Sequence, residues 1–118
     1  MAKNFEELRI WRDTRVFVFD IYSLMKENKD WGFKDQIQRA TVSIMNNIAE
    51  GSEYNSDASF VKFLNIARGS CAELRSMLYL SFDLGYCSKE QHDKLQAQLA
   101  TISSRIFKLI EYLKKSKG

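Results

Sequence analysis

A row of polar side chains follows one face of a predicted helix near the middle of the chain. Successive members are 3, 4, 4 and 3 residues apart, which places them in line along a helix. The row lies beside the apolar positions Ile37, Ile44 and Ile48, so it borders the expected core. Its amide, hydroxyl and charged groups could form a reactive site, contact RNA or hydrogen-bond to a neighbouring helix. The members of this row are Gln36, Arg39, Ser43, Asn47 and Glu50.

A second polar segment lies further along the chain, where the small residues Gly69 to Ala72 precede Glu73. Glycine inside a helix costs about 1 kcal/mol relative to alanine, so we expect the small side chains to admit another helix closely. An antiparallel pairing would bring Ser70 and Glu73 against the first row. We predict an ion pair between Arg39 and Glu73 at the inner edge of the two helices. We favour a hydrogen-bonded network that fixes helix register over a reactive site.

Side chains that could catalyse a reaction are few and lack partners in the sequence. Ser43 or Ser70 as a nucleophile would need a base, and the one histidine, His92, lies beside Asp93 in a charged helix start. We expect His92 to be exposed to solvent there. Cys71 falls on an apolar stripe, typical of an inert core thiol. The paired Glu-x-x-His motifs of di-metal bundles are absent. We therefore predict no enzyme activity, no catalytic residue, no metal site and no cofactor.

Glycines and capping residues divide the chain into four predicted helices. Ser56 suits an N-cap, Ser88 and Gln91 form a capping box, and Gly51 and Gly85 suit helix ends. The 118 residues contain no proline, and apolar residues recur at helical spacing with no competing strand pattern. We predict an all-α fold, an antiparallel up-down-up-down four-helix bundle that forms one domain over residues 1–118. The expected helices span about 5–28, 34–50, 57–84 and 89–115.

The predicted first helix has more apolar surface than a bundle core needs. Its two apolar rows cover an arc of roughly 160°, and Val16 and Phe19 project outside it. Single exposed apolar residues are normal on soluble proteins. A pair outside an already wide arc favours contact with another subunit. We therefore predict that Val16 and Phe19 lie in an oligomer interface.

Positive charge gathers at the C-terminal end of the sequence. The chain has 18 basic and 15 acidic residues, a net charge of +3, and residues 88–118 hold seven basic and three acidic ones. Such a cluster is usually a solvated helix end, and it also suits phosphate contacts. The residues that we consider for nucleic-acid contact are Arg9, Arg12, Lys108, Lys114, Lys115 and Lys117.

The sequence shows no feature of export or membrane insertion. The first ten residues include two glutamates and no apolar segment, and no run of about 18 apolar residues occurs. The two cysteines form no Cys-x-x-Cys motif, which suits reduced thiols. We expect a cytoplasmic protein.

The segment Gln36–Gly51, QIQRATVSIMNNIAEG, resembles the signature of the four-helix-bundle proteins encoded in intervening sequences of bacterial 23S ribosomal RNA genes. The resemblance continues through Phe63–Leu74, FLNIARGSCAEL, and covers nearly the whole chain. The family often has proline where Met45 stands and another near Trp31, and this chain lacks both. Their absence predicts a straighter helix and leaves the polar row unchanged.

The resemblance implies a bundle that assembles as a homopentamer and has no established catalytic activity. A related branch, the accessory variability proteins of diversity-generating retroelements, forms basic pentamers that partner reverse transcriptase and bind nucleic acid. Two functions therefore stay open for this chain. The first is a homo-oligomeric protein that binds RNA or DNA, and the second is an oligomeric protein-interaction scaffold without nucleic-acid contact.

Overall fold

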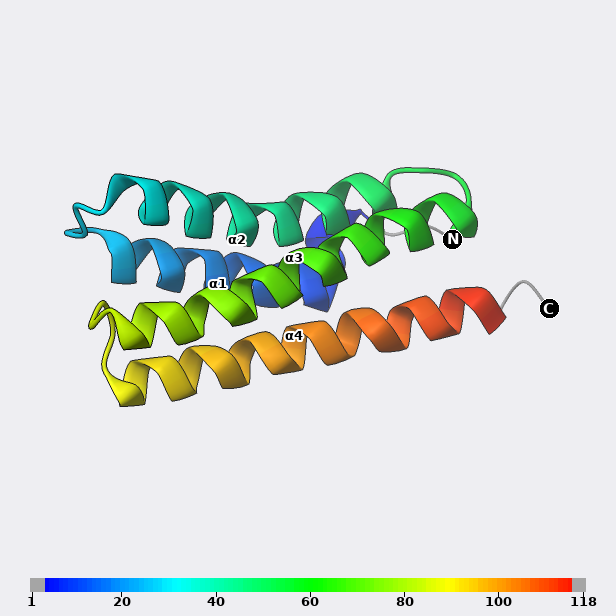
Figure 1. Ribbon diagram of the computed structural model, residues 1–118. Helices are drawn as coiled ribbons and strands as arrows, with labels where there is room; N and C mark the ends of the chain where they lie inside the picture. The colour runs from blue at the N-terminus through cyan, green and yellow to red at the C-terminus, as the bar shows by residue number, and fades with distance from the viewer. Residues whose placement is uncertain (1–3, 116–118) are drawn as a thin grey trace.

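Local interactions at the helix ends define where the helices begin. In this computed structural model, which describes residues 4–115, Asp30 accepts a hydrogen bond of 3.3 Å from the backbone N–H three residues on. Ser56 does the same at 3.1 Å, and Ser88 and Gln91 form a reciprocal capping box at 2.9 and 3.1 Å. The helices are α1, Arg9–Met25, α2, Trp31–Ser52, α3, Asp57–Asp83, and α4, Lys89–Lys115 (Figure 1).

The structure confirms the predicted caps and corrects the ends of the first two helices. Gly85 follows α3 with φ of 77°, a left-handed conformation that suits glycine. The 3-10 turn Phe5–Glu7 is separate from α1 because Leu8 is extended, with ψ of 125°. Helix α1 also ends at Met25 rather than residue 28. Helix α2 begins three residues earlier than predicted because Asp30 caps it.

Each helix packs against two neighbours, α1 and α3 both lying against α2 and α4. Asp13 of α1 contacts Arg105 of α4, and Asp20 contacts Gln98, so residue numbers rise along one helix and fall along the other. Successive helices run in opposite directions, and both termini lie at the same end of a bundle of 48 × 20 × 19 Å (Figure 1). Residues 4–115 therefore form an all-α four-helix bundle, as predicted, and contain no β-strand.

One hydrophobic core runs along the bundle and receives side chains from all four helices. Apolar residues at helical spacing line the buried face of α4, where Ile106 and Ile110 are fully buried and Leu109 is only partly buried. No helix within the described range is both long and apolar enough to cross a membrane. The largest fully buried side chains are Phe17, Ile21, Met25, Ile37, Ile44, Ile48, Leu64, Leu74, Leu78, Leu99, Ile106 and Ile110.

The close approach between α2 and α3 occurs at Gly51, whereas the sequence suggested the segment around Gly69. Gly51 was expected to end α2, but the helix continues to Ser52 and buries the glycine. A Cβ built on Gly51 would lie 2.7 Å from Cβ of Phe63 and 3.0 Å from Cδ1 of Phe60. A Cβ on Gly69 would meet nothing within 4 Å. The steric need for glycine therefore lies near the C-terminal end of α2.

Candidate functional site

Five of the seven predicted network residues form hydrogen bonds along the α2–α3 interface. Ser70 Oγ donates to Ser43 Oγ at 2.9 Å, and Gln36 Nε2 donates to Glu73 Oε2 at 3.3 Å. Asn47 Nδ2 donates to the Ser43 carbonyl at 2.8 Å and to its hydroxyl at 3.1 Å. The bonds from Ser70 to Ser43 and from Gln36 to Glu73 join the two helices, so they favour one register of α2 against α3. Neither serine contacts a histidine or a carboxylate in these bonds, so the arrangement suits structure better than nucleophilic catalysis.

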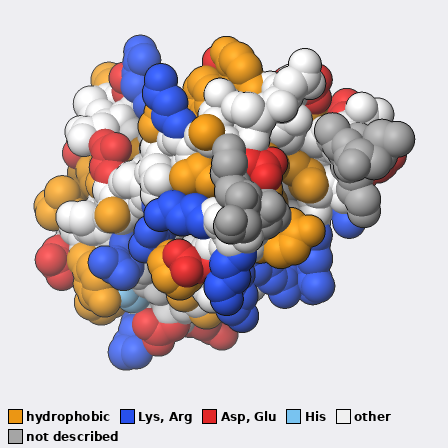
Figure 2. Space-filling model, turned by 90° about the vertical axis from the view of Figure 1, so that its right-hand side faces the viewer, with side chains coloured by type: hydrophobic (Ala, Val, Ile, Leu, Met, Phe, Trp, Pro, Cys, Tyr) orange, Lys and Arg blue, Asp and Glu red, His pale blue; other side chains and the backbone are white. Residues whose placement is uncertain are grey.

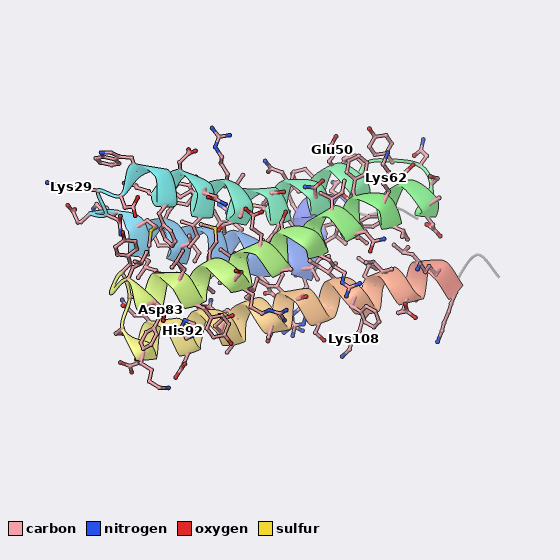
Figure 3. The ribbon with its side chains drawn as sticks, viewed as in Figure 1. Lys29, Glu50, Lys62, Asp83, His92 and Lys108 are labelled. Atoms are coloured by element: carbon pink, nitrogen blue, oxygen red, sulfur yellow. The ribbon has the colours of Figure 1, made fainter. Side chains whose placement is uncertain are left out.

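Arg39 and Glu50 lie outside this network, and the predicted ion pair between Arg39 and Glu73 is wrong. Arg39 Nε donates to Asp35 Oδ2 at 2.8 Å, one turn earlier on the same helix. This hydrogen bond raises the pKa of Arg39, and the side chain is 78% exposed. The nearer carboxylate on the same helix binds the guanidinium, while Glu73 is exposed and accepts from Gln36. Glu50 is also exposed and points away from the bundle (Figure 3).

His92 is buried, which corrects the expectation that it lies in solvent. Its Nδ1 is 3.1 Å from the Leu78 carbonyl oxygen, and its ring lies 5.0 Å from that of Tyr79 and 5.5 Å from that of Phe82. It sits near the start of α4, beside the last turns of α3 (Figure 3). The sequence does hold the signal, because extending the core spacing back from Leu95 reaches position 92. This histidine joins α3 to α4.

The described residues offer no cluster of metal ligands, and the Cys71 thiol is not activated. Within residues 4–115, no group of three or more His, Cys, Asp or Glu side chains could hold a metal ion. Cys71 is buried, and this burial raises the pKa of its thiol to about 11, against smaller lowering effects of a hydrogen bond with Ser103 and the charge of Arg68. The thiol is therefore neutral near pH 7, as an inert core cysteine should be.

The basic residues considered for nucleic-acid contact lie toward one end of the bundle. Arg9 and Arg12 begin α1, which starts well short of the end of the bundle, whereas Lys114 and Lys115 lie at that end, in the last turn of α4 (Figure 1). Lys108, two turns before the end of α4, points away from the bundle (Figure 3). Each is exposed, whereas Lys117 lies outside the described residues. Figure 2 shows this end, where Lys and Arg form several separate groups between hydrophobic and acidic side chains.

An apolar strip is exposed along the outer face of α1. Val16 is 57% exposed and Phe19 is 71% exposed, so both project from the core as their spacing predicts. Tyr22, three residues after Phe19, is 43% exposed and extends the strip. Val16 also lines a hollow between α1 and α4 that contains Asp13 and Arg105. We call Val16, Phe19 and Tyr22 the α1 outer strip.

Comparisons with known proteins agree with the resemblance seen in the sequence. The family model of the 23S rRNA-intervening sequence protein matches residues 6–108. A crystal structure from Bacteroides thetaiotaomicron, of a protein with unknown function from the S23 ribosomal protein family, is similar with a TM-score of 0.80 and 27% identity. The match covers 86% of this chain and 97% of that one. Among curated proteins, no match was found.

Proposed function

Since the chain belongs to the 23S rRNA-intervening sequence protein family, we propose that it is a cytoplasmic, non-enzymatic homo-oligomer that binds RNA or DNA weakly. The number of subunits most consistent with the family resemblance is five. The observation that carries the proposal is the α1 outer strip, because Val16 and Phe19 expose large apolar side chains on one helix face. Burying a Val or Phe side chain stabilises an interface by about 1.5–3 kcal/mol. A symmetric assembly repeats this gain at every interface.

The proposal that the protein is not an enzyme is supported by the contacts of its polar side chains. Ser43 and Ser70 bond to each other, and His92 contacts the Leu78 carbonyl. Cys71 holds its proton near neutral pH because burial raises its pKa. These two serines, this histidine and this cysteine therefore each have a structural partner or a neutral form. These contacts support a protein that acts through its surfaces.

Nucleic-acid binding is supported by charge and by repetition. One chain carries a net charge of +3, so a pentamer would carry about fifteen positive charges in excess. Weak contacts repeated on a ring raise the effective concentration of the next contact and sum to measurable avidity. Lysines at a helix end suit phosphates as point charges and read no bases. The separate basic groups in Figure 2 favour the alternative, an oligomeric scaffold for other proteins.

Replacing Lys114, Lys115 and Lys117 by glutamine should weaken nucleic-acid binding and flatten its salt dependence. Each lost phosphate contact lowers the slope of log affinity against log salt by about 1. Gel shifts with RNA and DNA fragments between about 50 and 200 mM salt measure this slope. Light scattering on the same variant should return an unchanged oligomer. Wild-type protein that shifts neither RNA nor DNA at about 50 mM salt would establish the scaffold function instead.

A further inference from the structure

The groove between α3 and α4 differs in charge from three other hollows of the surface. Each of those three contains a carboxylate together with a cation, namely Asp20 with Lys94, Asp35 with Arg39, and Asp13 with Arg105. The α3–α4 groove, with a volume of about 320 Å³, is lined by two arginines and by no acidic residue. Its charge is therefore not compensated within the groove, which favours an anionic ligand.

The two arginines, Arg68 and Arg75, lie on one face of α3. They are seven residues apart, which corresponds to two helical turns, or about 10 Å along the axis. The ion pairs found within residues 4–115 use Arg9, Arg39, Lys89 and Arg105, and neither groove arginine takes part. Both guanidinium groups thus keep their charge available to a ligand. Their spacing suits two separate anionic groups better than one.

The side chains on the floor of the groove are small and uncharged. Gly69, Ala72 and Ala100 line it, and a Cβ on Gly69 would meet open space. Asn65 and Ser103 add neutral hydrogen-bonding groups. An extended chain could therefore approach the helices closely between the two arginines without meeting a negative charge.

An exposed aromatic residue lies beside Arg68, and another lies one helical turn from Arg75. The Arg68 guanidinium lies 4.9 Å from the centre of the Phe107 ring, which remains 44% exposed. Tyr79 is 58% exposed and lies one turn beyond Arg75 on α3. Single-stranded nucleic acids bind to positively charged grooves in which bases stack on aromatic side chains. A free anion or a peptide carboxylate would not use the exposed Phe107 ring in this way.

We propose that the α3–α4 groove binds single-stranded nucleic acid, with Arg68 and Arg75 contacting separate phosphates and Phe107 stacking on a base. This assignment rests on the proposed function and names a site for it away from the terminal lysines. The phosphodiester backbone lies over the small residues, and the guanidinium groups hold it by charge-assisted hydrogen bonds. Because the contacts are to phosphates, they carry no sequence preference.

The test measures fluorescence anisotropy of a labelled 12-nucleotide oligouridine across a salt series. The double variant R68Q/R75Q should bind about tenfold more weakly at low salt. The slope of log affinity against log salt concentration should decrease in magnitude by about 2, because two phosphate contacts are lost. The variant A72E places a carboxylate within one turn of both arginines and should bind as weakly. F107A should lose affinity with little change in slope, because stacking releases no counterion. The matched control K26Q/K29Q removes equal charge from the α1–α2 turn and should bind like wild type.

The outcomes separate this inference from the proposed function. If wild type binds and R68Q/R75Q keeps the same affinity and slope, the groove assignment is overturned while nucleic-acid binding stands. If K26Q/K29Q loses as much affinity as R68Q/R75Q, the effect is general charge and the groove is again excluded. Stabilisation by inorganic phosphate without oligonucleotide binding would assign the groove to a free anion. A wild-type protein that binds no oligonucleotide at low salt overturns both proposals.

Discussion

Replacing Val16 and Phe19 by aspartate is expected to convert the oligomer into monomers of 13.8 kDa. Both side chains are more than half exposed in the single chain, so the change removes no core contact. It removes about 2–4 kcal/mol of apolar burial from each interface, because full burial is worth about 1.5–3 kcal/mol per side chain and 57% of Val16 and 71% of Phe19 is exposed. Burying unpaired carboxylates adds a further cost. The subunit dissociation constant should rise by at least a factor of about 100.

Light scattering during size-exclusion chromatography measures this change directly. Wild-type protein should give about 69 kDa, which is five times the chain mass, and the double variant should give one fifth of that. The matched control I66D/L80D places the same charge on exposed apolar positions of α3 and should leave the oligomer intact. Dissociation of the control alone would place the interface on α3. A wild-type monomer at micromolar concentration would contradict the oligomer itself.

Gly51→Ala is expected to destabilise the protein, whereas Gly69→Ala is expected to stabilise it. Alanine is favoured over glycine in a helix by about 0.8–1 kcal/mol, and Gly69 has the open space to accept it. At Gly51 the new methyl group would lie 2.7 Å from Phe63 Cβ, which cannot move without α3. Overpacking of this kind costs about 1–3 kcal/mol. The two substitutions are chemically identical, so the neighbouring helix alone decides the sign.

Urea denaturation at one fixed protein concentration measures both effects, since oligomer formation makes stability depend on concentration. The midpoint should fall for Gly51→Ala and rise for Gly69→Ala, with similar slopes for both variants. Circular dichroism before denaturation checks that each variant is still helical. A Gly51→Ala protein as stable as wild type would mean that α2 and α3 are further apart at this point.

The sequence predicted the helix ends that depend on neighbouring residues. Ser56 caps α3, Ser88 and Gln91 cap α4, and Gly85 takes a left-handed conformation, as predicted. Each of these interactions joins residues no more than three positions apart or concerns a single backbone angle. Such contacts need no knowledge of the rest of the fold. The same holds for Val16 and Phe19, whose exposure follows from helical periodicity alone.

Most residues of the polar network were predicted correctly, but one of the predicted pairs, Arg39 with Glu73, was wrong. Ser43, Ser70 and Gln36 do form hydrogen bonds across the α2–α3 interface, because their positions on the helix faces bring them there. The partner of Arg39 was wrong, since Asp35 lies one turn away on the same helix. The spacing of four residues was visible in the sequence and was the better guide. Only the structure gives the distance from the Arg39 guanidinium that identifies Asp35 rather than Glu73 as its partner.

The sequence by itself therefore determined the four helices, their main caps, the outward apolar residues of α1 and the family. Only the tertiary structure decided that Gly51 rather than Gly69 lies against another helix, that His92 contacts the Leu78 carbonyl, and that Arg68 and Arg75 share a groove without an acid. The physical reason is the separation along the chain of the residues that determine each feature. Caps and periodicity depend on a few neighbouring residues, whereas contacts between helices depend on their relative register and distance. Those are set by the packing of the whole core, and a shift of one turn exchanges every partner across an interface.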